Sequence, residues 1–480
     1  MGQASRPAAG LETGLCWTEA SRADLEVCRT IAVAHVPVYV RLAGMYRRRF
    51  LASLTAAAAG AAAARPADLR IDGARLRRHL EQLSVFGRPA GGTFADGVSR
   101  VAYSDADAAG RSYVMRLMEA AALKPRIDAA GNIIARRAGT DDSLAPVLFG
   151  SHIDSVPNGG NFDGDLGSLA AIEVVQTLEE AGVRTRRPLE VVVWSNEEGV
   201  AFNNGLAGSR AAADEWEPGE IDTVWNGVKK SDAIRKIGGA PEKIASARLV
   251  MGAFESYIEL HIEQGGTLEA EGIPVGVVDG IVAIHRYDVA VRGFANHAGT
   301  TPMPDRRDAL VAASHLVIAV NEIVRREPGR QVGTVGQLNL TPNAPNVVPG
   351  MVRLTVELRD LSAEKILRLA AEIRGRARQI AEQTQTEIDM KPVARHDASL
   401  ATSEVQKSIE TACGKLGLEF RHLPSGAGHD AQPMSTLGPM GMIFVPSVAG
   451  ISHSPKELTH WEDCANGANV LLQTVLLRAS

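Results

Sequence analysis

Two apolar stretches decide the fold, Pro146-Val-Leu-Phe-Gly-Ser-His152 and Leu189-Glu-Val-Val-Val-Trp-Ser195. Both are short, and the second is β-branched and almost uninterrupted, which is typical of strands in a parallel sheet covered on both faces. Between them, apolar side chains recur at helical spacing from Gly167 to Glu180. A strand, a helix and a second strand make a βαβ unit, so the sequence predicts an α/β sheet.

The middle of the chain has a different order of elements. Strands are expected at Ile281–Val291, Gly333–Leu340, Val348–Arg359 and Glu387–Pro392, and helices at Asp308–Arg326 and Ala363–Gln383. The order β-α-β-β-α-β is that of a ferredoxin-like domain. Because motif-bearing α/β segments resume after about residue 395, we predict that residues 279–394 are inserted into an α/β domain made of residues 67–278 and 395–480.

The size and composition of the chain limit the classes of protein that it can be. Its 480 residues are too many for one compact core, so two folded units and a tail are expected. A net charge of -5 gives no electrostatic argument for nucleic acid as a partner. The 4 cysteines form no C-x-x-C pair, so any metal must be bound by His and carboxylate side chains.

The sequence pattern of the N-terminal residues does not indicate that they belong to the folded units. Residues 1–44 lack clear periodicity, and we expect them to be a non-native or disordered extension, with translation starting at Met45. Residues 45–66 combine Met45-Tyr-Arg-Arg-Arg-Phe-Leu51 with an alanine-rich run, which resembles a twin-arginine signal peptide. The run is too short for a stable membrane span. The expectation is export to the periplasm, and the alternative is a cytoplasmic protein with an alanine-rich helix.

Five short motifs carry metal-capable side chains beside glycine, several of them directly after an apolar strand. They are Gly150-Ser-His152-Ile-Asp154-Ser155, Gly159-Gly-Asn-Phe-Asp163-Gly-Asp165, Asn196-Glu197-Glu198-Gly199, Glu259-Leu-His261-Ile-Glu263-Gln264-Gly265 and Gly450-Ile-Ser-His453-Ser-Pro455. Metal ions need lone pairs held in fixed directions, and ligand sites in open α/β sheets lie outside the carboxyl ends of the strands. Singly, such a His is usually a core residue, a Glu pair is surface and an Asp-Gly is a turn. Their joint occurrence predicts a metal site.

The spacing within the motifs suggests how such a site would work. In His152-x-Asp154 the carboxylate can reach the far imidazole nitrogen, which would fix the tautomer of the ring. Glu197 and Glu198 are consecutive at a strand end and cannot point the same way, so one can bind metal while the other faces the cleft as a base. Glycines beside Asp163 and Glu198 allow the backbone to turn tightly around an ion.

The motifs resemble the M20-type metallopeptidase superfamily and, within it, the hydantoinase/carbamoylase branch of N-carbamoyl-L-amino acid hydrolases, allantoate amidohydrolases and bacterial-type β-ureidopropionases. The resemblance runs from about Asp72 to about Leu477, and the segment from Thr185 to Gly199 is particularly similar to carbamoylases. It implies an M20-type catalytic domain with a mixed, largely parallel sheet. It also implies that the inserted ferredoxin-like α+β domain serves as a lid and dimerisation domain.

The resemblance implies two divalent ions in each subunit. His152 and His261 would bind one ion, and Glu198 and His453 the other. Asp163 would bridge them. At the position of His261 many peptidases of the superfamily use a carboxylate, so the histidine also points to the carbamoylase branch. These donors suit zinc, our default, as well as manganese, cobalt or nickel.

Catalytic roles follow from the same resemblance. Glu197 would be the general acid/base, and Asp154 would orient His152. His297, in Ala295-Asn-His-Ala-Gly-Thr-Thr-Pro-Met303, would stabilise the tetrahedral intermediate. In a homodimer, His297, and with it Asn346 and Arg359, would complete the active site of the partner; the alternative is that these residues act within their own chain.

Four further residues match positions that face the substrate in the family. Asn346 and Arg359 would hold a substrate carboxylate, for which the planar fork of arginine is well suited. Gln264 and the loop around Gly428 would also face the substrate. The simpler interpretations are a turn for Asn346, a surface ion pair for Arg359 and a loop histidine for His297.

The implied activity is hydrolysis of an N-carbamoyl-L-amino acid to ammonia, carbon dioxide and an amino acid. The closest rival is allantoate amidohydrolase, or a β-ureidopropionase, on the same scaffold. An M20 peptidase is a second rival. A non-catalytic binding protein is a third, and it would be expected to lack a ligand or the base, whereas this sequence has all of them.

Overall fold

The computed structural model describes residues 68–480. The extension expected at residues 1–44 and the signal peptide expected at residues 45–66 therefore lie outside the described residues. Between residues 68 and 480, no helix is both long enough and apolar enough to cross a membrane.

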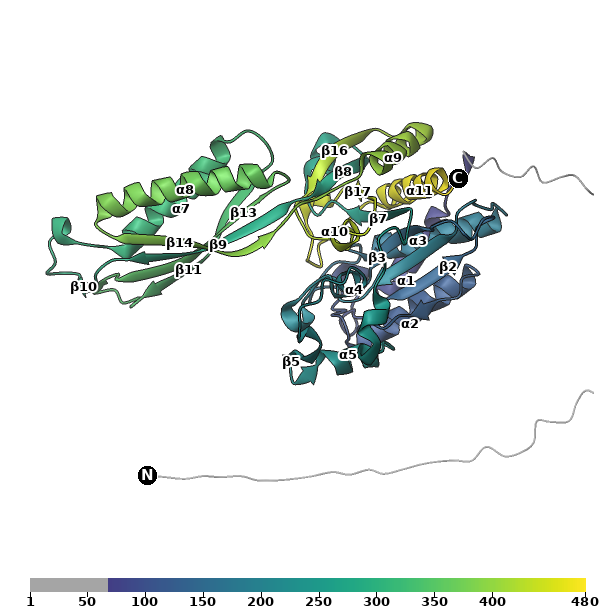
Figure 1. The fold of residues 1–480 in the computed structure, drawn as a ribbon, viewed down its shortest axis with the longest axis horizontal. Helices are drawn as coiled ribbons and strands as arrows, with labels where there is room; N and C mark the ends of the chain where they lie inside the picture. Colours follow the sequence, from purple (N-terminus) through teal and green to yellow (C-terminus); the bar gives the residue numbers. More distant parts are fainter. Residues whose placement is uncertain (1–67) are drawn as a thin grey trace, which may run out of the picture. The chain divides into compact units, whose positions relative to one another are not determined.

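The first sheet has nine strands and is mixed, with a parallel centre (Figure 1). In spatial order its strands are β1 (Arg126–Ile127), β2 (Ile133–Arg137), β4 (Leu189–Trp194), β3 (Val147–His152), β7 (Ser256–Ile262), β17 (Met440–Val445), β8 (Val275–Ile281) and β15 (Ser399–Leu400), with β16 (Phe420–Ser425) also paired to β8. Strands β4, β3, β7 and β17 are parallel neighbours, so their carboxyl ends meet at one edge. The predicted α/β class with a mixed, largely parallel sheet is confirmed.

Helices cover both faces of this sheet, which explains the uninterrupted apolar strands. On β3, Phe149 and Leu148 point to opposite faces and belong to separate hydrophobic clusters. The cluster with Phe149 includes side chains of α1 (Gly73–Leu83), α2 (Asp105–Ala120), α3 (Asp165–Glu180), α9 (Ser403–Leu416) and α11 (Trp461–Arg478). The cluster with Leu148 includes side chains of α4 (Ala207–Ala212) and α10 (Ala431–Met434). Shorter elements on the connections are β5 (Val224–Trp225), β6 (Val228–Lys229), α5 (Lys230–Lys236) and α6 (Thr267–Glu271).

Between β8 and β15 the chain forms the inserted domain, which is teal to green in Figure 1. Its sheet is antiparallel, and α7 and α8 pack against one face of it. The strands in spatial order are β11 (Val332–Thr341), β13 (Met351–Asp360), β9 (Ala283–Arg292) and β14 (Glu387–His396), and the helices are α7 (Ala309–Arg326) and α8 (Ala363–Thr384). The order along the chain is the expected β-α-β-β-α-β order.

One strand of the inserted domain begins later than the sequence predicts. The strand expected from Val348 begins only at Met351, because Pro349 has no N–H to donate to a sheet. The residues before this proline form a separate short strand, β12 (Val347–Val348), which pairs with β10 (Asn296–His297).

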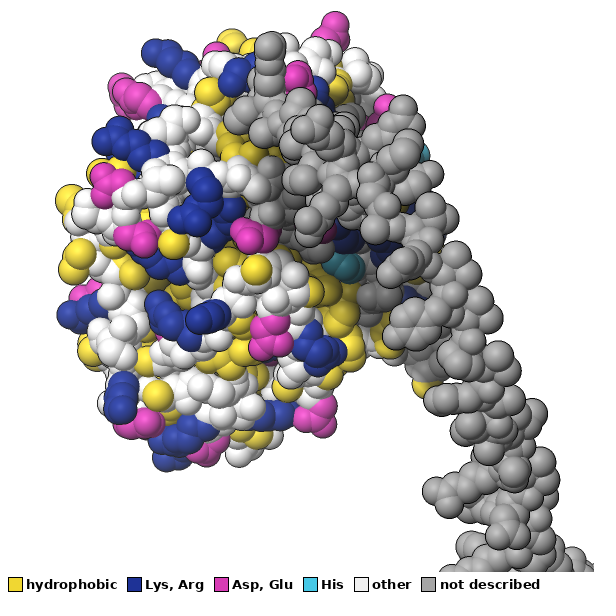
Figure 2. All heavy atoms as spheres, turned by 90° about the vertical axis from the view of Figure 1, so that its right-hand side faces the viewer, with side chains coloured by type: hydrophobic (Ala, Val, Ile, Leu, Met, Phe, Trp, Pro, Cys, Tyr) yellow, Lys and Arg dark blue, Asp and Glu magenta, His cyan; other side chains and the backbone are white. Residues whose placement is uncertain are grey.

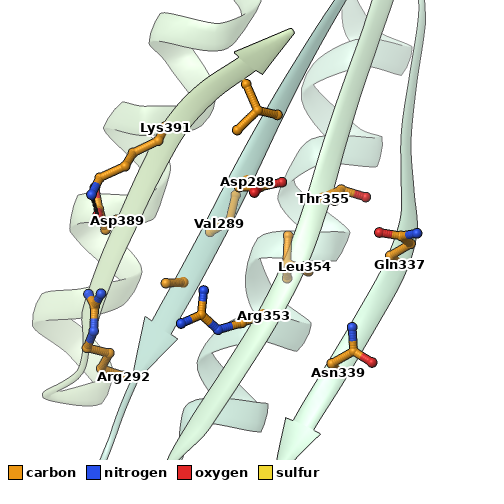
Figure 3. Close-up of a pocket in the computed structure, with 12 residues that line it drawn as sticks. Asp288, Val289, Arg292, Gln337, Asn339, Arg353, Leu354, Thr355, Asp389 and Lys391 are labelled. Carbon is orange, nitrogen blue, oxygen red and sulfur yellow. Dashed lines mark ion pairs between the residues drawn. The ribbon is translucent and has the colours of Figure 1, made fainter. Parts of the chain in front are cut away.

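The other face of the inserted domain's sheet is open. In Figure 3 the helices lie behind the strands, and polar side chains such as Asp288, Arg353 and Lys391 line a hollow of about 330 Å³ on the near side. Along β9, Tyr287 and Val289 are buried, while Arg286 and Asp288 between and beside them are exposed. This period of two assigns one face of the sheet to the core and the other to water.

The surface of the described chain carries both signs of charge. On the face in Figure 2, dark blue basic and magenta acidic side chains are interspersed with apolar and neutral ones. Where described atoms are visible on this face, basic side chains do not form a stripe of the kind that attracts phosphate backbones.

Candidate metal centre

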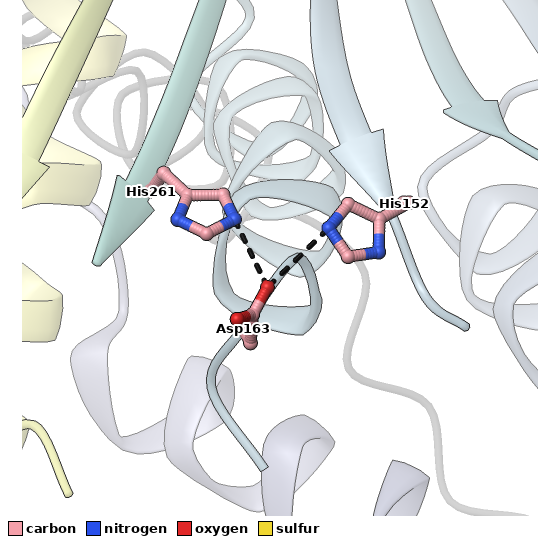
Figure 4. A group of neighbouring side chains, drawn as sticks. All are labelled: His152, Asp163 and His261. Carbon is pink, nitrogen blue, oxygen red and sulfur yellow. Dashed lines mark ion pairs between the residues drawn. The ribbon is translucent and has the colours of Figure 1, made fainter. Parts of the chain in front are cut away.

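Asp163 lies at the centre of a cluster at the carboxyl edge of the first sheet (Figure 4). Its Oδ1 atom is 3.4 Å from Nε2 of His152 and 3.2 Å from Nε2 of His261. His152 ends β3 and His261 lies near the end of the parallel neighbour β7, so the sheet itself brings the two imidazoles together. All three side chains are buried.

Both imidazoles present a lone pair to Asp163. Nδ1 of His152 lies 3.0 Å from the carbonyl oxygen of Asp154, and Nδ1 of His261 lies 2.9 Å from that of Ile262. A carbonyl can only accept, so each Nδ1 carries the proton and each Nε2 is unprotonated in the neutral ring. Within residues 68–480, the buried Nε2 of His152 has no hydrogen-bond partner. Two nitrogen acceptors facing a carboxylate oxygen fit a divalent cation.

The second oxygen of Asp163 faces a second pair of ligand atoms. Its Oδ2 atom is 3.4 Å from Nε2 of His453, which in turn is 3.3 Å from Oε2 of Glu198. The donors thus divide into two groups that share one carboxylate. The structure brings together all five residues that the sequence predicts as ligands, in an arrangement that fits two ions bridged by Asp163.

The close approach of these groups perturbs their ionisation. Burial, assisted by the charge of Asp163, raises the pKa of the Glu198 carboxyl to about 8. The hydrogen bond to Asp163 raises the pKa of His453 to about 9. For Asp163 itself, burial acts to raise the pKa, but the imidazoles of His261, His152 and His453, when they are protonated in the absence of a metal, hold it well below its ordinary value. Protons and divalent cations therefore compete for the site.

Gly164 turns the chain from Asp163 into α3. Its φ is +66°, and a Cβ atom at this position would lie 2.4 Å from Cε1 of His152. A larger residue would therefore displace a ligand, in addition to the strain of the left-handed backbone. Asp163 lies just before the N-terminus of α3, where the partial positive charge of the helix stabilises a carboxylate.

Glu197 lies beside His152 and outside both ligand groups. Its Oε2 atom is 3.6 Å from Nε2 of His152. Burial raises the pKa of the Glu197 carboxyl well above its ordinary value, and the charges of Asp430 and Glu198 act in the same direction. A carboxyl group with a raised pKa beside a reaction site is suited to accept and return a proton near neutral pH.

Asp154 makes a different contact from the predicted one. Its carbonyl oxygen, rather than its carboxylate, meets Nδ1 of His152, and the nearer carboxylate oxygen is 3.9 Å away. The carboxylate instead accepts the backbone N–H groups of Glu197 at 3.1 Å and Glu198 at 3.2 Å. The physical reason is that the chain leaves β3 at His152 and directs this side chain toward the loop after β4. Asp154 therefore positions the two glutamates as well as the histidine.

Glu457 holds the loop that carries Asp163, although the sequence motifs did not single it out. Its Oε1 atom accepts the backbone N–H groups of Phe162 at 3.0 Å and Asp163 at 3.1 Å. Its Oε2 atom accepts the hydroxyl of Ser452, which also lies 3.0 Å from Oδ2 of Asp163. The available signal was position, because Glu457 follows closely after His453 in the fifth motif.

A buried polar layer supports the ligands from behind. Glu259 accepts hydrogen bonds from the Ser151 hydroxyl at 2.7 Å and the Tyr257 hydroxyl at 3.2 Å. The ring of His429 packs edge-on against that of His261, with 4.5 Å between centroids. These contacts limit the side-chain conformations of the residues on the ligand-bearing strands, as precise metal sites require.

A cavity of about 720 Å³ lies beside the metal centre, lined by Gln264, Arg359 and Gly426 among others. Gln264 donates from Nε2 to Oδ2 of Asp163 at 2.6 Å, while its Oε1 atom is buried without a partner among the described residues. Arg359 donates to the carbonyl of Gly426 at 2.6 Å and to Glu357 at 2.8 Å. Gly428 is exposed in the same loop as Gly426. Three of the predicted substrate residues, Gln264, Arg359 and Gly428, thus lie in or near this cavity.

His297 and Asn346 are not brought to this cavity. His297 pairs with Val347 in the β10–β12 ladder, which precedes the start of β13, whereas Arg359 lies near the end of β13. At about 3.3 Å per residue, the eight steps from Met351 to Arg359 span about 26 Å. Within one chain, the predicted substrate-binding residues therefore form two separate groups.

The ring of His297 is nevertheless fixed in one tautomer. Its Nδ1 atom accepts the backbone N–H groups of Gly299 at 3.0 Å and Thr300 at 3.2 Å. In the neutral ring the proton must then be on Nε2. His297 is exposed, so this N–H group is available as a donor to another molecule.

Comparisons with known proteins agree with this geometry. The family model "Peptidase family M20/M25/M40" matches residues 148–477. An N-carbamoyl-L-amino acid amidohydrolase of Geobacillus stearothermophilus is 41% identical over 84% of this chain and 98% of its own length. The allantoate amidohydrolase of Escherichia coli (strain K12) is 35% identical over 82% of this chain and 94% of its own length.

A solved structure shows the same fold over most of the chain. The crystal structure of an amidase of the hydantoinase/carbamoylase family from Burkholderia multivorans superimposes with a TM-score of 0.79 at 35% identity, covering 86% of this chain and 98% of that one. The predicted resemblance is confirmed. The chain belongs to the peptidase family M20/M25/M40, in its hydantoinase/carbamoylase branch, and is a hydrolase of carbon–nitrogen bonds other than peptide bonds.

Proposed function

We propose that the chain is a binuclear metal-dependent amidohydrolase that cleaves the linear C–N bond of a carbamoyl group, with N-carbamoyl-L-amino acids as substrates. The observation that carries this proposal is Asp163, whose two oxygens each face a separate pair of ligand atoms. When bound, two divalent ions in such a site act as Lewis acids and lower the pKa of water. Zinc is our default, and manganese, cobalt and nickel suit the same donors.

Glu197 moves the protons in this proposal. Its carboxylate lies next to the ligand groups without belonging to either, so one of its oxygens can take a proton from the attacking water. Attack on the carbamoyl carbon forms a tetrahedral intermediate. Glu197 then returns the proton to the departing nitrogen. The carbamoyl group leaves as ammonia and carbon dioxide, and the amino acid is set free.

Arg359 binds the carboxylate of the substrate. Its guanidinium shares Glu357 with Arg286, which lies 2.5 Å from the same carboxylate. Two arginines and one glutamate leave one positive charge, so the group attracts an anion even though Glu357 already contacts Arg359. The unpartnered Oε1 atom of Gln264 faces the same region and can accept an N–H group of the carbamoyl moiety.

His297 and Asn346 act on the substrate of a partner subunit. The N–H of His297 Nε2 is suited to an oxyanion, but within its own chain it lies far from the metal centre. A homodimer through the inserted domain is supported by β11, whose second edge is unpaired within the described chain. Exposed apolar side chains lie on this strand and on the neighbouring helix α7: Val311, Ile318, Val332 and Leu338.

Allantoate is the alternative substrate. The E. coli relative of that name covers nearly the same part of the chain, and the geometry of the ligands and of Glu197 serves either reaction. Both substrates pair a carboxylate with a ureido group, so Arg359 does not discriminate between them.

The test combines metal analysis with ammonia release from a panel of N-carbamoyl-L-amino acids, β-ureidopropionate and allantoate. We expect two divalent ions per subunit and the highest kcat/KM on a carbamoyl amino acid. A protein loaded with metal that releases ammonia from none of these compounds would refute the proposal. A preference for allantoate would select the alternative.

A further inference from the structure

The cavity beside the metal centre is lined by a second arginine, to which the proposed function gives no role. Arg330 lines the same cavity as Gln264 and Arg359. It precedes β11, and β11 begins with Val332, which lies directly opposite Arg359 in the β11–β13 ladder. The two arginines therefore reach the cavity from neighbouring strands. The volume of about 720 Å³ is within the range of small-molecule sites, about 300–1,000 Å³.

Arg330 is not neutralised by its own chain. Within residues 68–480 its guanidinium takes part in no hydrogen bond or ion pair, and the side chain is exposed. The neighbouring Glu327 is bound by Arg368 at 2.6 Å. Arg330 thus differs from Arg359, whose guanidinium already contacts a carboxylate and a carbonyl.

Glu263 is the acidic residue that lines this cavity, and its carboxylate is already engaged. One oxygen accepts the backbone N–H of Thr267 at 2.9 Å, and the other accepts that of Leu268 at 2.8 Å. These N–H groups belong to the first turn of α6, where a carboxylate is held in place. Glu263 therefore does not compete with a ligand for Arg330.

We infer that Arg330 selects substrates with a second negative charge, namely N-carbamoyl amino acids whose side chain carries a carboxylate. This inference rests on the proposed function. Arg359 holds the α-carboxylate, the carbamoyl group lies toward Asp163 and Gln264, and the side chain of the substrate extends toward Arg330. A free guanidinium at the end of the cavity forms charge-assisted hydrogen bonds with a carboxylate but gains little from a neutral amide of the same shape.

The experiment compares two isosteric substrates on the metal-loaded protein, N-carbamoyl-L-glutamate and N-carbamoyl-L-glutamine. We expect the ratio of their kcat/KM values to favour glutamate by about tenfold, as one charge-assisted contact provides. Arg330→Gln should bring the ratio close to one, and Arg330→Glu should invert it. The matched control is Arg325→Gln, an exposed arginine in the last turn of α7 that does not line this cavity. It should keep the wild-type ratio.

Ionic strength gives an independent readout. Raising NaCl from about 0.05 M to about 0.5 M should reduce the wild-type ratio, because screening weakens an exposed ion pair. It should leave the ratio of Arg330→Gln unchanged. A wild-type ratio near one, or the same ratio in wild type and Arg330→Gln, overturns the inference. If no carbamoyl or ureido compound releases ammonia, the proposed function fails as well.

Discussion

The candidate metal ligands and the candidate substrate residues are arranged differently in the two sheets of the chain. At the carboxyl edge of the first sheet, parallel strands end side by side, and one chain supplies every candidate ligand, of which His453 alone is exposed. In the inserted domain, the candidate substrate residues lie at opposite ends of β13 and are largely exposed. The difference shows that the candidate metal ligands lie together within one chain, whereas the candidate substrate residues do not.

The division has a physical origin in the two sheets. Parallel strands place their carboxyl ends at one edge, so residues far apart in sequence converge there. An antiparallel sheet places successive connections at opposite ends, so His297 and Arg359 are separated by the length of a strand. The predictions below test whether the first region is self-sufficient and whether the second needs a partner subunit.

The largest effect is expected for Glu197→Gln. The amide cannot take a proton from water, so kcat should fall by about 10³-fold or more. Because Glu197 is in neither ligand group, the metal content should stay at the wild-type value, measured by elemental analysis next to ammonia release. Wild-type turnover in this variant would contradict the proposed role. Loss of metal together with activity would make Glu197 a ligand instead.

The second prediction tests the division between subunits. His297→Ala should reduce kcat by about 10²-fold, since one donor to the oxyanion is lost. Coexpressed with Glu197→Gln, it should regain about a quarter of wild-type activity, because half of the randomly formed dimers are mixed and each contains one intact site.

Two outcomes would change this picture. No recovery in the mixed dimer would mean that His297 acts within its own chain, which requires a large movement of the inserted domain. A monomer in sedimentation experiments with full activity would remove the need for a partner altogether.

The third prediction concerns pH and is confined to the metal centre. In the metal-free protein the pKa of Glu198 is about 8 and that of His453 about 9, so both groups are protonated below pH 8. Binding an ion must displace these protons, and the affinity should therefore rise with pH, by up to tenfold per unit for each proton released, and level off above about pH 9. Titration with Zn²⁺ in weakly buffered solution would measure the released protons. An affinity that does not change between pH 6 and pH 9 would exclude these two residues as ligands.

The smallest effect is expected for Glu457→Gln. The variant keeps one acceptor for the N–H groups of Phe162 and Asp163, but it replaces the other oxygen with a donor toward Ser452. We expect metal affinity to fall by about tenfold, the lower end of the range for residues that orient ligands, with little change in kcat at saturating metal. Exposed Glu462→Gln on α11 is a matched control and should change neither quantity. An unchanged affinity in Glu457→Gln would show that the Asp163 loop is held by its backbone alone.

Much of the candidate metal centre could be predicted because its signals are local. Each predicted ligand stands in a glycine-flanked motif. His152 ends one strand and Glu198 comes shortly after another, and both strands are recognisable from their apolar character. Glu457 could not be predicted in this way. Its role depends on hydrogen bonds to Phe162 and Asp163, which are almost three hundred positions away along the chain. The contact of Asp154 depends likewise on the direction in which the chain leaves β3.

The sequence by itself determined the order of the elements and the chemistry of the donors, because hydrophobic periodicity and residue type are properties of short segments. Only the tertiary structure decided which of these segments meet. The parallel sheet gathers His152, Glu198, His261 and His453 around the carboxylate of Asp163. The length of β13 keeps His297 away from Arg359. Arg330 is a further example. In the sequence it is an arginine in a loop, and only the tertiary structure shows that it lines a cavity together with Gln264 and Arg359.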